Sequence, residues 1–197
     1  MAKFHYRESP TQKQINAFSK YLSEDEELVL VTGFSSAYLR QEAIISFAFP
    51  GIIFGLIGVG LGWFLGFSKV WTATLALVLM FLCSVIKTMH SYHSNRYLLT
   101  TRRVMIKKGI FGVKLSTALY DKITHIEVDQ GLVDRMLLHH GNIIVNTAGM
   151  NKNEFTLRFV DYPIELKNLL ERLINREREQ MGRKFESLSA VEGEIIS

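Results

Sequence analysis

The sequence predicts an α+β membrane protein, in which a two-helix transmembrane hairpin is joined to a small antiparallel barrel or sandwich closed by a C-terminal helix. Two uncharged stretches, residues 43–68 and 70–86, are separated by a single lysine. After the second stretch the apolar residues recur with period two, which is typical of half-buried strands. From Pro163 onward the spacing changes to that of an amphipathic helix.

The hairpin follows from the length of the uncharged stretches. They hold 26 and 17 residues, and about 20 residues cross a bilayer core as a helix. Because proline inside a helix costs about 3 kcal/mol, we expect Pro50 in the first turn of the first span. The spans then cover about 50–67 and 70–87. Aromatic residues, which favour the membrane–water interface, gather near the turn: Trp63, Phe67 and Trp71.

The distribution of positive charge predicts the topology. The turn carries only Lys69, whereas five cations flank the opposite ends of the spans: Arg40, Lys87, Arg96, Arg102 and Arg103. By the positive-inside rule, both termini of this multi-pass protein are cytoplasmic, at the inner (cytoplasmic) membrane.

A cleaved signal peptide is not expected, because 42 mostly polar residues come first. The single cysteine, Cys83, lies within the second span and excludes an intramolecular disulfide.

The chain divides into four expected parts: 1–42, an N-terminal cytoplasmic helix and strand; 43–87, the hairpin; 88–178, the β domain; and 179–197, a polar, partly disordered tail. In the first part, residues 11–22 fit an amphipathic helix and residues 28–32 fit a strand. Two interpretations stay open for this part. Either it packs on the β domain and adds an edge strand, or its helix binds a partner.

Six short strands in meander order are expected in the β domain: 97–100, 104–108, 113–120, 125–129, 143–148 and 155–160. In the third of them, Val113, Leu115 and Leu119 alternate with Lys114 and Ser116, the pattern of a half-buried strand. A helix opens at Pro163, a position that the fixed φ of proline suits. Its apolar stripe consists of Leu166, Leu169, Leu170 and Leu173.

The order of several short motifs resembles a known family. These are the run from Tyr97 to Val104, the Lys107-Lys108-Gly109 step, residues 120–123 (Tyr-Asp-Lys-Ile), and residues 130–138 followed by 141–145 and 147–149. Together they are similar to the bacterial pleckstrin-homology-like (PH-like) domain family of the membrane type, over about residues 90–175. The resemblance implies a PH-like fold behind a transmembrane hairpin and a non-enzymatic role at a membrane. It implies no particular ligand or binding residue.

Basic charge is concentrated directly after the hairpin. Residues 87–122 hold eight Lys or Arg and one Asp, a net charge of +7. Anionic lipids attract such segments by about 1 kcal/mol for each Lys or Arg near the surface. Nucleic acid is the competing interpretation of a basic cluster, but phospholipid headgroups are the polyanion nearest to a tethered segment. We expect one end of the β domain to contact anionic lipid through Arg102, Arg103, Lys107, Lys108 and Lys114.

Glycines recur along one side of the first span. Their steps of 4, 3, 4 and 4 residues keep them on one helical stripe: Gly51, Gly55, Gly58, Gly62 and Gly66. Small residues let two helices approach closely in lipid. The stripe therefore either seats the second span or mediates homo-oligomerisation or docking to another membrane protein.

Catalytic and metal-binding patterns are not apparent. The histidines His90, His93, His125, His139 and His140 do not have the spacing of a metal site, and no cofactor motif occurs. The sequence thus predicts a non-enzymatic, membrane-anchored binding or scaffolding module without cofactor, whose basic face meets anionic phospholipid. The alternative is an accessory or oligomeric subunit of a larger membrane assembly.

Overall fold

The computed structural model describes residues 6, 9–66, 68–110, 112–132, 134, 139–148 and 155–195. Its strands form a four-stranded antiparallel sheet, β1-β2-β3-β4, and a three-stranded antiparallel sheet, β5-β6-β7. The strands are β1 Leu28–Gly33, β2 Asn95–Thr100, β3 Arg103–Lys108, β4 Lys114–Leu119, β5 Ile123–Asp129, β6 His140–Thr147 and β7 Thr156–Asp161. The helices are α1 Gln12–Phe18, α2 Ser36–Phe64, α3 Lys69–Ser94 and α4 Pro163–Ile195, with short 3-10 helices at Ser19–Tyr21 and Tyr120–Lys122. The predicted combination of two antiparallel sheets with helices is confirmed. Phe67 and most of residues 133–138 of the motif region lie outside the described residues.

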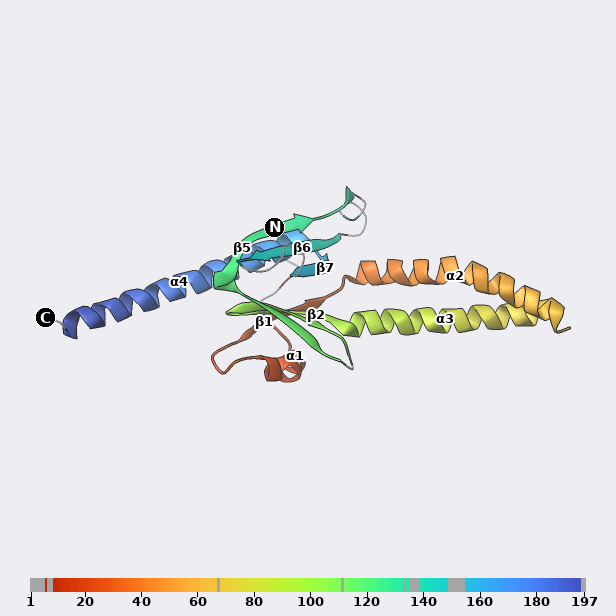
Figure 1. Ribbon diagram of the computed structural model, residues 1–197, viewed down its shortest axis with the longest axis horizontal. Coiled ribbons are helices and arrows are strands. Elements are labelled where there is room, and N and C mark those ends of the chain that lie inside the picture. The colour runs from red at the N-terminus through yellow and green to blue at the C-terminus, as the bar shows by residue number, and fades with distance from the viewer. Residues whose placement is uncertain are drawn as a thin grey trace.

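The α2–α3 hairpin is inserted into the sandwich. Strand β1 comes before it and β2 after it, yet the two strands pair, with Leu30 opposite Leu99 and Val31 opposite Leu98. The β domain is therefore built from both sides of the hairpin, and the boundary expected at residue 42 does not separate it from the N-terminal part. Figure 1 shows the hairpin projecting from one end of the sandwich and the C-terminal part of α4 projecting at the opposite end.

The main core lies between the two sheets and α4. The predicted leucine stripe of α4 is buried there, and all four of its side chains are at most 1% exposed. Two tyrosines are buried beside it and still satisfy their hydroxyl groups: Tyr97 donates to the carbonyl oxygen of Arg158, and Tyr120 to that of Thr100. A buried tyrosine keeps its apolar contribution only when its O–H finds such a partner.

A second, smaller core lies on the outer face of the four-stranded sheet. Leu28, Leu98 and Met105 form it, and Ile15 and Phe18 of α1 cover it. Of the two interpretations of the N-terminal part, the structure has the one in which helix and strand pack on the β domain.

Strand β4 is at one edge of its sheet. The sequence pattern predicted that the face with Val113, Leu115 and Leu119 would be buried, but the opposite face is buried. Ala118 faces the core, whereas Leu115 and Leu119 are about two-fifths exposed. The register explains the difference: Ala118 is opposite Val104 of the inner face, and Leu115 is opposite Lys107 of the outer face. Periodicity alone could not choose between the faces, because both carry apolar groups.

Helix α2 begins fourteen residues earlier than expected. Its N-cap is Ser35, whose hydroxyl accepts from the backbone N–H groups of Ala37 and Tyr38. Pro50 thus lies inside the helix and not in its first turn, which corrects the prediction. Proline removes one backbone hydrogen bond and crowds the preceding turn, and α2 bends about halfway along its length (Figure 1). The packing of α2 on α3 supports the helix through this defect.

The two hairpin helices also meet through specific contacts at their sandwich end. The Ser84 hydroxyl of α3 donates to the carbonyl oxygen of Ala43 in α2, and the rings of Phe47 and Phe81 meet edge to face. At the same level Lys87 lies 3.4 Å from Glu42. These contacts hold the helices side by side where they leave the sandwich.

The C-terminal helix is longer than predicted. Helix α4 continues to Ile195, through the residues expected to form a partly disordered tail. The sequence from 176 to 187 keeps helix-forming residues of mixed charge, so nothing in it stops the helix at 178.

Candidate functional site

The cations at the two ends of the sandwich are paired differently. Strand β2 continues directly from α3, so the end that holds Asn95 is the hairpin end, and the end that holds Thr100 is the far end. The turn between β3 and β4 is at the hairpin end, because the register places Asn95 opposite Lys108. The turn between β2 and β3 is at the far end.

Four cations gather at the hairpin end. Arg96 of β2 is opposite Lys107 of β3, and Lys108 is opposite Lys114 of β4. The Arg96 guanidinium lies over the ring of Tyr92, 4.4 Å from its centroid, and Lys107 Nζ donates to the carbonyl oxygen of Gly109 at 3.3 Å. We call Arg96, Lys107, Lys108 and Lys114 the basic collar.

The collar is not neutralised by the protein itself. Among the described residues, no carboxylate lies within salt-bridge distance of any of its four side chains. Lys108 and Lys114 are both exposed and directly opposite one another. Like charges at such a cross-strand position are destabilising. The arrangement therefore costs free energy in the isolated protein.

The far end contains cations that the protein does neutralise. The Arg103 guanidinium binds both carboxylate oxygens of Glu26, with Nε at 2.8 and 3.0 Å, and also donates to Ser23 Oγ. The Glu26 carboxylate additionally accepts from Thr100 Oγ1, and its side chain is fully buried. Arg102 Nε is 4.0 Å from the Glu177 carboxylate of α4. These contacts attach the β2–β3 turn to the segment after α1 and to α4.

The ionisation of Glu26 reflects this arrangement. Burial by itself would raise the pKa of the Glu26 carboxyl, but the hydrogen bonds from Arg103 and Thr100 outweigh burial and hold the pKa below its ordinary value of 4.5. The same pairing raises the pKa of Arg103. The far-end pair is therefore charged in the folded state and acts as a structural latch.

The predicted cluster of five cations is thus divided between the two ends. Lys107, Lys108 and Lys114 lie together in the collar, whereas Arg102 and Arg103 lie at the far end, about 20 Å away by the length of a six-residue strand. The prediction was wrong on this point because successive turns of a meander fall at opposite ends of the sheet. The sequence also missed Arg96 as a member of the collar. The alignment of β2 with β3 would have found it.

The glycines of α2 do not act alike. Gly58 packs most closely on α3: a Cβ at this position would lie 2.9 Å from the carbonyl oxygen of Thr72 and 3.0 Å from Cβ of Ala76. Gly55 faces Leu77 at ordinary contact distance, and nothing lies within 4 Å of a Cβ at Gly51. Gly62 is buried. Gly66 is not on the stripe, because α2 ends at Phe64 and Gly66 has a φ of +71° in the turn that follows.

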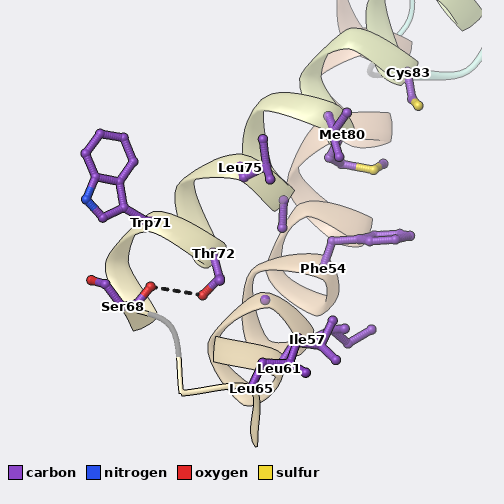
Figure 2. Close-up of a pocket in the computed structure, with 13 residues that line it drawn as sticks. Phe54, Ile57, Leu61, Leu65, Ser68, Trp71, Thr72, Leu75, Met80 and Cys83 are labelled. Atoms are coloured by element: carbon purple, nitrogen blue, oxygen red, sulfur yellow. Dashed lines mark hydrogen bonds between the residues drawn. The ribbon is translucent and has the colours of Figure 1, made fainter. Parts of the chain in front are cut away.

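An apolar groove runs along the hairpin near its turn. It has a volume of about 930 Å³ and is lined by residues of both helices, including Phe54, Leu61, Thr72 and Met80. Figure 2 shows Leu61 and Phe54 on the α2 side and the Thr72 hydroxyl directed at the carbonyl oxygen of Ser68, to which it donates at 3.3 Å. The polar groups in the groove are thus largely satisfied within the hairpin.

The described residues contain no group of three or more His, Cys, Asp or Glu that could hold a metal ion.

The architecture defines a class of protein. A four-stranded and a three-stranded antiparallel sheet packed face to face, with a helix after the last strand, form a PH-like domain. The model of the bacterial PH domain family matches residues 46–175, which include most of the hairpin helices. The chain therefore belongs to the bacterial PH domain family, and the resemblance noted in the sequence is confirmed for the family.

Two solved structures are similar to the chain. One is a DUF1696-family protein with a pleckstrin-homology domain from Shewanella loihica PV-4, with 9% identity and a TM-score of 0.44 over 85% of this chain and 99% of that one. The other is a pleckstrin homology domain from Shewanella amazonensis SB2B, with 11% identity and a TM-score of 0.45 over 86% and 92%. No curated protein matches the chain.

Proposed function

We propose that this protein is a membrane-anchored PH-like module that acts by binding rather than by catalysis. Its hairpin spans the inner membrane, both termini are cytoplasmic, and the basic collar binds anionic phospholipid. The observation that carries the proposal is the position of the collar. Four cations that have no carboxylate partner among the described residues lie at the end of the sandwich from which the hairpin emerges.

The exposure of the hairpin supports its place in a bilayer. Helices α2 and α3 are each long and apolar enough to span a membrane, but only 12% and 6% of their most apolar windows are buried within the protein. A core helix of a soluble protein would be mostly buried. Large apolar side chains such as Trp63, Phe64 and Trp71 are at least three-quarters exposed. Contiguous exposed apolar surface of this kind requires an apolar environment or a partner.

The chemistry of the collar supports anionic lipid as the ligand. Lysine and arginine near a membrane surface gain about 1 kcal/mol each from anionic headgroups. The repulsion between Lys108 and Lys114 is relieved when phosphate groups approach them. The nearest cation along α3, Lys87, is instead paired within the hairpin, 3.4 Å from Glu42.

The proposal can be tested with the full-length protein in mixed bilayers. We expect spin-labelled phosphatidylglycerol to associate with the protein more strongly than spin-labelled phosphatidylcholine. Replacing the three lysines of the collar together (Lys107→Gln, Lys108→Gln, Lys114→Gln) should remove most of this preference. The matched control is Arg102→Gln with Lys122→Gln at the far end, which should leave the preference unchanged. Equal preference in wild type and triple variant would contradict lipid binding by the collar.

The topology is tested separately. Reporter fusions at Ser68 in the hairpin turn and after Ser197 should report opposite compartments, with the C-terminal reporter in the cytoplasm. If both reporters indicate the same compartment, the hairpin does not cross the membrane.

A second candidate function is favoured by the groove between the hairpin helices. The groove presents apolar side chains at a level where Gly58 already brings α2 and α3 together, which would suit a further membrane helix. In that case the protein is an accessory or oligomeric subunit, and the collar only orients the sandwich. Mild solubilisation followed by sizing distinguishes the two, because a larger assembly that depends on the groove should be lost in a Leu61→Trp variant.

A further inference from the structure

We infer that the turn between β3 and β4 penetrates the headgroup layer of the membrane with apolar side chains, and that Leu132 does the same from the other sheet. The inference rests on the proposed function, since it takes the hairpin to lie in a bilayer. It goes beyond the function because it assigns a second, non-electrostatic contact and fixes the orientation of the sandwich.

The β3–β4 turn exposes two apolar residues. Ile110 is 41% exposed and Val113 is 47% exposed, and both lie beyond the last paired residues of the strands. Neither belongs to either of the two hydrophobic cores of the described residues. We call Ile110 and Val113 the apolar tip.

The turn is held in a fixed position beside the hairpin. The Gly109 backbone N–H donates to the carbonyl oxygen of Ser94, the last residue of α3, at 2.8 Å. Gly109 has a φ of +92°, and a Cβ there would lie 1.9 Å from the carbonyl oxygen of Gly112, so only glycine permits this tight turn. Gly109 and Gly112 therefore lie close together at the base of the turn, beside the end of α3.

The position of Ser94 places the tip at the membrane surface. Lys87, the first charged residue after the uncharged stretch of α3, precedes Ser94 by seven residues, or about 10 Å of helix. The headgroup layer occupies about 5–8 Å on each side of the hydrocarbon core. Strand β3 runs toward the end of the sandwich from which the hairpin projects, so the turn that follows it faces the proposed bilayer. Ser94 thus lies just outside the headgroup layer, and the apolar tip, which extends toward the bilayer from this level, is within reach of it.

The flanking residues favour this occupant over a protein partner. Lys107 and Lys108 precede the tip, and Lys114 follows it. An apolar centre with lysines on both sides matches an anionic membrane interface, where lysine stems pack on apolar groups and their ammonium groups reach phosphate.

Leu132 provides a second contact at the same end. It is 80% exposed and follows β5, whose last residue, Asp129, is opposite Asn142 at the hairpin end of the second sheet. That end is joined to α2 directly, because the Ser35 hydroxyl donates to the Asp161 carboxylate and the Tyr38 ring stacks on Phe159 at 3.8 Å. One apolar contact from each sheet, together with the hairpin, would hold the sandwich at three points.

The test uses an environment-sensitive label on the full-length protein in nanodiscs that contain doxyl-labelled phosphatidylcholine. In a Cys83→Ala background, the label is placed at Ile110→Cys, at Leu132→Cys and, as the far-end control, at Lys122→Cys. The wild-type protein labelled at Cys83, which is exposed on α3, reports the hairpin itself. We expect blue-shifted emission and quenching at residues 83, 110 and 132, and neither at residue 122.

Quenching at Cys83 with none at residues 110 and 132 overturns the inference and leaves the proposed function intact. No quenching at Cys83 contradicts the membrane hairpin and therefore the proposed function. If residue 110 is quenched only when phosphatidylglycerol is added to phosphatidylcholine, attraction by the collar alone accounts for the contact and the apolar contribution is overturned. Quenching in phosphatidylcholine alone supports it.

Discussion

The hairpin end and the far end of the sandwich use the same residue types for opposite purposes. At the far end, Arg103 is bound by a buried Glu26, and Arg102 lies near Glu177. At the hairpin end, Lys108 and Lys114 lie opposite one another with no described carboxylate nearby. In a basic segment of sequence, the cations that are paired with carboxylates of the protein must therefore be distinguished from those that are not. Only the second kind indicates a binding surface for an external anion.

The largest effect is expected from opening the far-end latch. Glu26→Ala leaves the Arg103 guanidinium and the Thr100 hydroxyl without their carboxylate. Because removal of one partner from a buried pair costs about 3–5 kcal/mol and Arg103 is 23% exposed, we expect a loss of about 3 kcal/mol. Chemical denaturation of the protein in one detergent measures it. Asp121→Asn, which removes an exposed ion pair with Lys122, should cost less than about 1 kcal/mol. Equal losses in the two variants would show that Glu26 is not a latch.

A somewhat smaller loss of stability is expected from a substitution in the hairpin. Gly58→Leu forces a side chain against the backbone of Thr72 and Ala73, and overpacking of this kind costs about 1–3 kcal/mol. Gly60→Leu is the matched control, since nothing lies within 4 Å of a Cβ at that position. Both changes raise hydrophobicity, so both variants should still insert. Thermal unfolding in detergent should separate them, and similar midpoints would argue against close packing at Gly58.

The pH dependence of stability provides a further test of the latch. The pKa of Glu26 is lowered on folding, so its charged form stabilises the protein above the unfolded pKa of about 4.5, and this stability is lost as the pH falls through the lowered pKa. Glu26→Gln should therefore be less stable than wild type by about 1–2 kcal/mol at neutral pH. The difference should shrink below about pH 4.5. A difference that is constant down to acidic pH would exclude the charge of Glu26 as its cause.

The smallest effect separates stability from binding at the hairpin end. Lys114→Glu places an acid opposite Lys108, so the sandwich should gain a few tenths of a kcal/mol while the preference for anionic lipid falls. Lys114→Gln should remove the repulsion without adding an attraction. Its stability should therefore lie between those of the wild type and Lys114→Glu. Loss of both stability and lipid preference in Lys114→Glu would indicate that the collar supports the fold and not the membrane contact.

Much of the fold could be predicted from the sequence because its signals are local. The leucine stripe of α4 follows directly from helical periodicity, and the short apolar runs of β2 and β3, bounded by polar and turn residues, indicate strands. The start of α2 could not be predicted, because the penalty for Pro50 suggested a first-turn position. The Ser35 cap and the packing on α3 outweigh that penalty.

The candidate site was predicted only in part because it depends on register. Lys107, Lys108 and Lys114 are close in sequence and remain close in space across one turn. Arg96 joins them through the pairing of β2 with β3. Arg103 lies at the opposite end of the sheet, where Glu26, 77 residues earlier in the chain, binds it. Neither relation is visible in composition or in the order of charges.

The insertion of the hairpin between β1 and β2 has a consequence for the order of folding. Strand β1 is synthesised first, and its partner β2 follows only after residues 34–94 have been synthesised. Closing an unstructured loop of that length would cost about 4 kcal/mol in chain entropy. Two antiparallel helices of similar length bring Gly33 and Asn95 back together, so in the proposed membrane setting insertion removes most of this cost. We therefore expect the four-stranded sheet to form only after the hairpin has inserted, which would delay completion of the domain until its anchor is in place.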